Sequence, residues 1–295
     1  MIARSIRSEC RARIALLQES AGITPCLAVL LIGANSASQV YVRNKIKASA
    51  DVGIRSELYE FPDDVDSQEV IRTIKRLNED PDVHGILVQL PLPPHFDPQK
   101  VLRTISVDKD VDGFHLYNVG GLVVGETIFS PCTPYGVMKI LDSAGILIEG
   151  KNVVIVGASN IVGKPMALMM MRREATVAVC HAKPRDLAQF TILADILVVA
   201  AGVPNLILPQ MVRTGAVVID VGINRLADGS IVGDVDFDGV RRKASFITPV
   251  PGGVGPMTVT MLLANTISAA ERVQALAQGG SSIDPVGETK EVFAN

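Results

Sequence analysis

The sequence predicts an α/β fold with two domains, each built around a mainly parallel sheet. Short apolar runs with the length of buried strands alternate with helical segments, a pattern typical of βαβ units. The chain has 295 residues, enough for two domains with buried cores. Apolar residues make up 48% of it and tryptophan is absent, so we expect cores of aliphatic side chains.

The composition excludes several classes of protein. A charged fraction of only 20% excludes disorder of the whole chain, and a net charge of −3 offers no basic footprint for nucleic acid. The first residues carry arginines instead of the apolar run of a signal peptide, and no segment reaches the length of a membrane span. We therefore expect a cytoplasmic protein without nucleic-acid or membrane partners.

The cysteine pattern predicts neither disulfides nor a metal site. The cysteines are scattered and form no CxxC pair, and no histidine spacing indicates zinc. They are Cys10, Cys26, Cys132 and Cys180. We expect a reducing compartment and no bound metal.

The first domain is expected to begin with a buried strand over residues 26–32. Ser36 and Gln39 predict a capping box at the start of a helix that runs to Val52 and ends at Gly53. A second strand, a helix and a third strand are predicted over 56–61, 67–77 and 85–90, and Pro91 ends the last strand.

A second α/β series begins near Lys151. Strands are predicted over 152–156, 176–180, 196–201 and 216–221, with a helix over 165–173. A glycine-bearing turn, Gly157 to Gly163, connects the first of these strands to that helix. This is the layout of a Rossmann-type dinucleotide-binding domain with a parallel sheet.

The last long helix is predicted from Thr258 to about Leu276, and we expect it to return to the first domain. Residues 1–130 plus 257–280 would then form a discontinuous catalytic domain, and residues 131–256 the Rossmann-type domain. We expect a catalytic cleft between these two domains and a mobile tail over residues 281–295.

The helix after the first strand carries a candidate acid/base. At about 100° per residue, Lys45 shares a face with Tyr41, Ala48 and Val52, whereas Lys47 points away. Desolvation on such a face would lower the pKa of Lys45 toward neutrality, as a proton carrier requires. The alternative is a surface lysine whose stem packs on the core.

Two further polar side chains are candidates for the same site. Gln89 stands near the end of a predicted parallel strand, where ligands bind in such sheets, although it could equally cap the sheet edge. Asp112 belongs to the acidic segment Asp108 to Gly113, which lacks the glutamate of a calcium loop. One carboxylate there could grip the N–H edge of a heterocycle, or the segment could be a solvated turn.

The turn from Gly157 to Gly163 is a candidate pyrophosphate site, because the amides of the following helix start can bind an anion. After the strand over 176–180 come His181, Ala182 and Lys183 without a nearby carboxylate, and Arg172 and Arg173 stand on the preceding helix. Basic residues there favour the 2′-phosphate of NADP over the ribose of NAD.

The segment Ile247 to Thr258 combines three prolines and three glycines, so its backbone path is tightly restricted. Together with Tyr41 to Lys45, Val88 to Pro91, Asp110 to Gly113, Pro131 to Pro134 and Gly157 to Gly163, it resembles the bifunctional methylenetetrahydrofolate dehydrogenase/methenyltetrahydrofolate cyclohydrolase family. The resemblance runs from about Cys26 to Val273.

The resemblance implies a homodimer that uses NADP to oxidise 5,10-methylenetetrahydrofolate and then hydrolyses the methenyl product to 10-formyltetrahydrofolate. It implies that Lys45 is the general acid/base, that Gln89 tunes it, that Tyr41 stacks on the pterin and that Asp112 grips the pterin ring. The residues expected at the substrate are Tyr41, Val88, Gln89, Leu90, Asp112, Pro251, Gly252, Gly253 and Val254. Those expected at the cofactor are Gly157, Ala158, Ser159, Ile161, Val162, His181, Ala182, Lys183, Ala201, Gly202, Gly222, Ile223 and Thr258.

Alternatives remain for cofactor and function. Some relatives place arginine at Ala158 and serine at Ala182, so NAD is the second choice of cofactor. A monofunctional NAD(P)-dependent dehydrogenase of the same fold is the first alternative function, and a non-enzymatic nucleotide-binding sensor is the second. A sensor has no reason to place a desolvated lysine beside a pterin site.

Overall fold

The computed structural model describes residues 2–278, so the predicted tail over 281–295 lies outside the described residues. The chain divides into two compact units. Of the described residues, one unit contains Arg4–Ser130 and 262–278, and the other contains Pro131–Met261 together with Ile2 and Ala3. We call them the lysine unit and the glycine-turn unit, after the Lys45 helix and the turn at Gly157.

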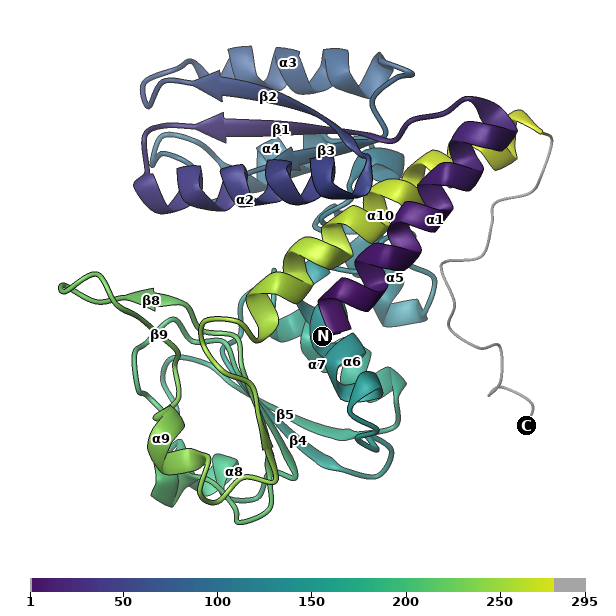
Figure 1. The fold of residues 1–295 in the computed structure, drawn as a ribbon. Coiled ribbons are helices and arrows are strands. Elements are labelled where there is room, and N and C mark those ends of the chain that lie inside the picture. The colour runs from purple at the N-terminus through teal and green to yellow at the C-terminus, as the bar shows by residue number, and fades with distance from the viewer. Residues whose placement is uncertain (1, 279–295) are drawn as a thin grey trace. The chain divides into compact units, whose positions relative to one another are not determined.

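The lysine unit is built on a three-stranded parallel sheet in the order β2-β1-β3. Its strands are β1 (Cys26–Ile32), β2 (Arg55–Phe61) and β3 (Gly85–Val88). Helices α2 (Ser36–Val52) and α3 (Ser67–Glu79) lie on opposite sides of these strands (Figure 1). Alternate residues of β1 are buried on the face toward α3 and α4 (Pro98–Thr104), and the residues between them are buried as well, which is why the central strand is apolar throughout.

Helix α2 begins one residue earlier than the predicted capping box implies. The side chain of Asn35 accepts a hydrogen bond from the Ser38 N–H at 3.0 Å, so Asn35 is the N-cap and the predicted role of Ser36 is wrong. The reason is the backbone of Asn35, which is extended as a cap requires, whereas Ser36 already lies in the helix. The predicted end is confirmed, because Gly53 adopts a left-handed conformation at the C-cap.

Four elements of the lysine unit were not predicted. They are α1 (Ile2–Ala21), α4, the 3-10 helix η1 (Val107–Lys109) and α5 (Leu116–Val124). Helix α1 buries Cys10, Ile14 and Leu17, and its charged residues obscure that narrow apolar stripe in the sequence. Arg13 of α1 pairs with Glu271 of α10 (Val254–Ala277), so these helices run side by side.

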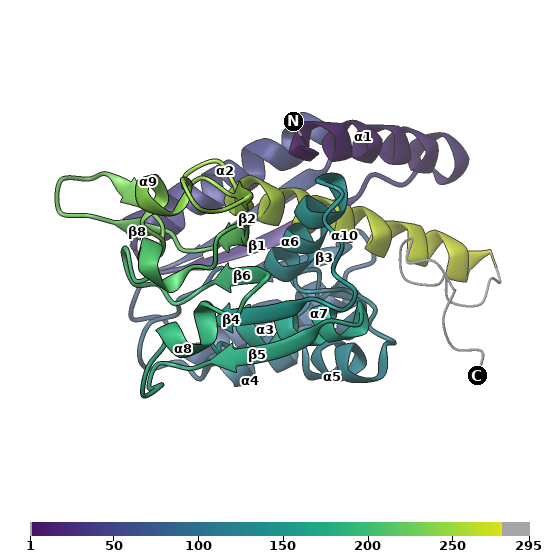
Figure 2. The same ribbon diagram turned by 90° about the horizontal axis from the view of Figure 1, so that it is seen from below.

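The glycine-turn unit contains a five-stranded parallel sheet in the order β10-β7-β6-β4-β5. The strands are β4 (Asn152–Val156), β5 (Thr176–Cys180), β6 (Ile196–Val199), β7 (Val217–Asp220) and β10 (Phe246–Ile247). Figure 2 shows β4 between β5 and β6. The chain leaves β4 first toward β5 and then returns to β6 on the other side, and this reversal is the switch point at which dinucleotides bind.

Shorter elements complete this unit. They are α6 (Cys132–Ser143), α7 (Gly163–Arg172), α8 (Ala188–Thr191), the 3-10 helix η2 (Pro209–Met211), the antiparallel pair β8 (Asn224–Arg225) and β9 (Ile231–Val232), and α9 (Phe237–Val240). The strand predicted over 196–201 begins as expected but ends two residues early, and the strand predicted over 216–221 is one residue shorter at each end, because these residues already belong to loops.

Helix α10 begins at Val254, four residues before the predicted start at Thr258. Pro256 falls in its first turn, where the missing N–H of proline costs no helical hydrogen bond. The loop part of the Pro/Gly segment therefore ends at Gly253. The remaining residues of the segment, 254–258, belong to the helix.

Candidate active site

Helix α2 buries a lysine. The side chain of Lys45 is 5% exposed, although Arg43 and Lys47 on the same helix are exposed to solvent. The Lys45 Nζ lies 4.8 Å from the centroid of the Tyr41 ring, one turn earlier on the helix. The prediction that Lys45 and Lys47 lie on different faces of the helix is therefore confirmed.

Gln89 contacts this lysine from the end of β3. Its Oε1 accepts a hydrogen bond from Lys45 Nζ at 3.1 Å, and its Nε2 donates to the Leu90 carbonyl at 2.6 Å. The second bond defines the orientation of the Gln89 amide. Because Nε2 donates to the Leu90 carbonyl, the oxygen Oε1 faces the lysine and accepts from it. The strand itself stops at Val88, two residues before the predicted end, so Gln89 stands just beyond it.

Val88 and Leu90 flank this glutamine differently. Val88 is 3% exposed and belongs to the core on the α3 side of the sheet, so its side chain packs against protein. Leu90 is half-buried and is followed by a cis peptide bond to Pro91. Any ligand contact of Val88 would have to come from its backbone.

Asp112 is half-buried and follows Val111, whose side chain packs against Gly85 at the start of β3. The Val111 carbonyl accepts a hydrogen bond at 2.8 Å from Nδ2 of Asn265 on α10. Asp112 is thus anchored through its neighbour to the same strand that leads to Gln89.

The neighbouring Asp110 is a buried carboxylate that the sequence did not single out. It is 1% exposed and accepts hydrogen bonds from the N–H groups of Phe114 and His115 and from Nδ2 of Asn118. Burial raises its pKa to about 7, although these three hydrogen bonds act in the opposite direction. Asp110 therefore shapes the loop that carries Asp112.

The turn after β4 is closely packed and depends on glycine. Gly157 has φ +116°, and a Cβ at this position would collide with the carbonyl of Ala200. A Cβ at Gly163 would collide with the carbonyl of Gly157. The Ser159 hydroxyl accepts hydrogen bonds from the N–H groups of Val162 and Gly163, at 3.1 and 3.3 Å. The turn leads into α7, whose first amides are the expected pyrophosphate ligands.

The other predicted cofactor residues of this turn and of the β5 end are accessible. Ala158, Ile161 and Val162 are half-buried, and His181, Ala182 and Lys183 are exposed. The Lys183 N–H donates to Nδ1 of His181 at 3.0 Å, so a tight turn follows β5.

The structure separates Arg172 and Arg173 from that turn. Both stand at the carboxyl end of α7, which precedes the start of β5, whereas Lys183 follows its end. The five residues of β5 span about 13 Å. Arg173 also donates to the Asp142 carboxylate at 2.9 Å. The expectation that all three cations meet at one phosphate is therefore wrong. Lys183 remains the candidate for binding the 2′-phosphate.

The loops after β6 and β7 carry the other predicted cofactor residues. Ala201 and Gly202 are exposed after β6, and Gly222 is buried and Ile223 57% exposed after β7. Both strands end at the ligand-binding edge of the sheet, so the structure brings these residues to the same edge as the glycine turn.

In the Pro/Gly segment, Pro251 and Gly252 are exposed, Gly253 is half-buried and Val254 is buried. Gly252 has φ +103°, and no protein atom lies where its Cβ would be. A ligand can therefore approach the backbone at this residue. Thr258 lies one turn into α10, and its hydroxyl is 3.0 Å from that of Thr133 on α6.

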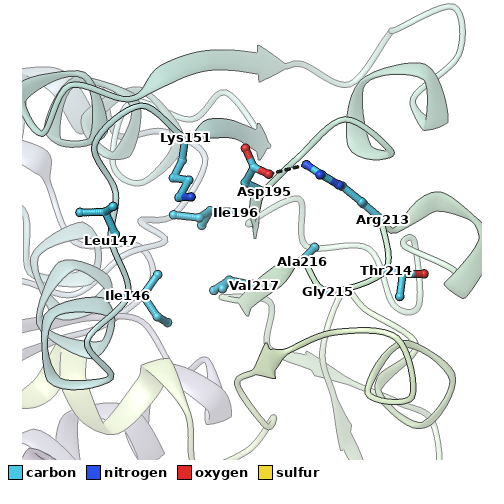
Figure 3. A pocket seen from close by; sticks show the side chains of 10 residues that line it. All are labelled: Ile146, Leu147, Lys151, Asp195, Ile196, Arg213, Thr214, Gly215, Ala216 and Val217. Atoms are coloured by element: carbon cyan, nitrogen blue, oxygen red, sulfur yellow. Dashed lines mark hydrogen bonds and ion pairs between the residues drawn. The ribbon is translucent and has the colours of Figure 1, made fainter.

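A cavity of about 320 Å³ lies at the opposite edge of the five-stranded sheet (Figure 3). Its polar lining includes Lys151, Asp195 and Arg213, and the last two form an ion pair. It lies at the amino ends of β6 and β7, away from the edge where parallel sheets bind ligands.

Within residues 2–278, no group of three or more His, Cys, Asp or Glu side chains could hold a metal ion. Over the same residues, none of the helices has both the length and the apolar character needed to cross a membrane.

The family models for tetrahydrofolate dehydrogenase/cyclohydrolase match most of the chain. The catalytic-domain model matches residues 1–112, and the NAD(P)-binding-domain model matches residues 131–274. The chain belongs to this family. The expectation drawn from the motifs is thereby confirmed, as is the α/β fold with a Rossmann-type domain.

Known members of the tetrahydrofolate dehydrogenase/cyclohydrolase family are similar over nearly their whole length. The bifunctional protein FolD of Nitrosospira multiformis is 59% identical over 278 residues, which are 94% of this chain and 96% of that protein. The crystal structure of the bifunctional enzyme FolD from Campylobacter jejuni is 52% identical with a TM-score of 0.89, covering 91% of this chain and 95% of that one.

A third relative is the methylenetetrahydrofolate dehydrogenase-cyclohydrolase of Trypanosoma brucei, solved in complex with NADP and an inhibitor. It is 42% identical with a TM-score of 0.89, and the match covers 92% of this chain and 95% of that one.

Sequence reasoning missed the buried carboxylates of both units. Besides Asp110, these are Asp220, 3% exposed, and Asp234, fully buried. Burial raises the pKa of Asp220 to about 6. The available signal was an aspartate within two residues of a glycine, at the end of a strand in Asp220-Val221-Gly222 and in the loop pair Gly233-Asp234. Such a pair indicates a carboxylate that lies close against the backbone.

Proposed function

We propose that this protein oxidises 5,10-methylenetetrahydrofolate with NADP⁺ and then hydrolyses the methenyl product to 10-formyltetrahydrofolate. The observation that carries the proposal is the buried Lys45, with Gln89 on its Nζ and the Tyr41 ring one turn away. Burial disfavours the ammonium form of a lysine, and a residue that both takes and gives a proton needs its neutral form to be accessible.

Lys45 acts on both proton transfers of the hydrolysis. Its neutral Nζ takes a proton from the water that attacks the methenyl carbon. The resulting ammonium then gives a proton to the ring nitrogen that leaves as the ring opens. Gln89 accepts from Nζ and so keeps the amine in place between the two steps.

The substrate contacts are proposed from family membership and from the exposure of the residues. Tyr41 stacks on the pterin, and Asp112 accepts hydrogen bonds from its N–H edge. The remaining proposed contacts are Val88 through its backbone, Leu90, Pro251, Gly252, Gly253 and Val254. Gly252 supports this assignment because nothing occupies the space beside its Cα.

The glycine-turn unit fits a dinucleotide. At Gly157 and Gly163 a Cβ would strike backbone atoms, so this turn is as tight as a dinucleotide fingerprint requires. When bound, NADP⁺ supplies the hydride acceptor for the oxidation. The first amides of α7 hold the pyrophosphate, and Lys183 pairs with the 2′-phosphate.

The division of work between the segments is also a proposal. We assign the folate chemistry to residues 1–130 plus 257–280 and cofactor binding to residues 131–256. The NAD(P)-binding-domain model begins at residue 131, as the second assignment does, and supports it, although the model runs on to residue 274.

We further propose that the protein is a cytoplasmic homodimer. The edge strand β5 supports a second copy as partner, because Val179 is 41% exposed on it. Nearby Phe190 and Leu193, which line a groove beside β4 and β5, are 44% and 63% exposed. Light scattering of the purified protein distinguishes a dimer from a monomer.

A two-stage assay tests the function. NADPH formation is followed with 5,10-methylenetetrahydrofolate, and loss of methenyl absorbance is followed separately with the methenyl compound. Both signals are expected. Reduction without hydrolysis would indicate the monofunctional dehydrogenase, and cofactor binding without either reaction would indicate the sensor.

A further inference from the structure

A buried carboxylate ties together the loops that follow β6 and β7. Oδ2 of Asp234 accepts hydrogen bonds from the N–H groups of Ala201 and Gly202, at 2.7 and 2.8 Å. Its Oδ1 accepts from Nδ2 of Asn224 at 2.8 Å. Asp234 is fully buried, although Ala201 and Gly202 are exposed, and the charge of the acceptor strengthens each of these bonds.

A second carboxylate holds the first in place. Oδ1 of Asp220 accepts from the N–H groups of Gly222 and of Asp234 itself, both at 3.0 Å. Its Oδ2 accepts from the Val235 N–H at 3.0 Å. Asp220 is the last residue of β7, so the sheet fixes the backbone of Asp234 through this side chain.

The glycines around the pair fit the two carboxylates closely. A Cβ at Gly222 would overlap the carboxylate of Asp234, and a Cβ at Gly233 would overlap the carboxylate of Asp220. Each aspartate therefore lies flat against the backbone of the other's loop. This arrangement leaves the loops with one accessible path.

The position of these loops relates them to one half of a dinucleotide. In the order β10-β7-β6-β4-β5, the glycine turn follows β4, and the ribose-phosphate end of the adenosine half belongs at β5. The other half, which carries the nicotinamide, must then extend over the ends of β6 and β7. Those are the ends that Asp234 holds.

We propose that Asp234, supported by Asp220, is a positioning residue that holds Ala201, Gly202 and Gly222 in the path that receives the nicotinamide half of the cofactor. This inference rests on the proposed function. Asp234 acts through the backbone amides, because its own oxygens are occupied and buried. Its removal would loosen the loops without changing any residue that touches the cofactor.

Calorimetric titration with NADP⁺ tests the proposal on three variants of the full chain. Asp234→Ala removes the acceptor of three charge-assisted bonds, two of them from the backbone of Ala201 and Gly202, and the Kd for NADP⁺ is expected to rise about 10–100-fold. Asp234→Asn keeps an oxygen for Ala201 and Gly202 and can donate to Asn224 once that amide turns over. Its Kd is expected to stay within about threefold of wild type.

Asp195→Ala is the matched control. Asp195 also accepts a backbone N–H, that of Asn152, and pairs with Arg213, but it stands at the opposite end of β6. Its loss perturbs the same sheet away from the loops, so the Kd for NADP⁺ should be unchanged. Hydrolysis of the methenyl compound without NADP⁺ is expected to stay within about twofold of wild type in Asp234→Ala, whereas general unfolding would abolish it.

The possible results distinguish a failure of the proposed function from a failure of the positioning role of Asp234. A wild-type protein that does not bind NADP⁺ would overturn the proposed function itself. Wild-type binding with an unchanged Kd in Asp234→Ala, or an Asn variant as weak as the Ala variant, would overturn only the positioning role. If Asp234→Ala does not fold, Asn224→Ala removes one support of the carboxylate. An NADP⁺ Kd unchanged by that substitution would equally overturn the positioning role.

Discussion

Nζ of Lys45 and Oε1 of Gln89 lie 3.1 Å apart, although 44 positions separate the two residues in the chain. The helix α2 and the end of β3 bring them together, because both follow parallel strands of one sheet. The contact joins a proton carrier to a side chain that can only accept from it.

The first prediction concerns the proton carrier. Lys45→Met keeps the volume of the stem and removes the amine, so hydrolysis of the methenyl compound should fall about 10²–10⁴-fold. Hydride transfer depends on positioning more than on proton transfer and should fall less. Lys47→Met, on the exposed side of the same helix, is the control and should leave both rates unchanged. Unimpaired hydrolysis in Lys45→Met would remove Lys45 from the mechanism.

Gln89→Glu tests the tuning of Lys45. A carboxylate beside Nζ favours the ammonium, which raises the pKa of the lysine. The acid limb of the pH-rate profile for hydrolysis should therefore move to higher pH. Gln68→Glu, an exposed residue on α3, adds the same charge away from the site and should leave the profile in place. Coincident profiles for Gln89→Glu and wild type would exclude the tuning role.

Lys183→Ala tests the choice of cofactor. The lost contact with the 2′-phosphate should weaken NADP⁺ binding by about 1.5–3 kcal/mol and leave NAD⁺ nearly unaffected. Arg173→Ala is the control, because Arg173 pairs with Asp142 near the other end of β5. The ratio of the Kd values for the two cofactors decides the question. An equal change of this ratio in both variants would show that the phosphate is bound elsewhere.

The buried Asp110 should make stability depend on pH. Burial raises its pKa in the folded protein from the ordinary 3.8 to about 7, so the folded state binds the proton more tightly. The resulting stabilisation is fully present below about pH 4 and is lost as pH rises through about 7. The free energy of unfolding of wild type minus that of Asp110→Asn should thus fall over this window, by at most ~1.4 kcal/mol per pH unit.

Urea unfolding at several pH values measures this difference. Asp108→Asn is the control, because that carboxylate is exposed and makes a pair with Arg272 at the surface. The same comparison for Asp108→Asn should show little dependence on pH. A flat difference for Asp110→Asn would mean that its carboxyl group titrates normally in the folded protein.

Most strands and the faces of helix α2 could be predicted from the amino-acid sequence. Alternation of apolar runs and helical segments predicted the βαβ units, because burial on both faces of a parallel strand requires a continuous apolar run. Helical periodicity separated Lys45 from Lys47, since that separation depends only on 100° per residue. Glycine at 157 and 163 marked the tight turn for the same local reason.

Contacts between groups that are distant in the chain became visible in the folded structure. It placed Gln89 on Lys45, and it placed Arg172 and Arg173 at the wrong end of β5 for the predicted phosphate. It also brought Asp234 to the amides of Ala201 and Gly202, across 33 and 32 positions. Such contacts depend on strand order and on which strand ends share an edge, and no local pattern in the chain encodes that order.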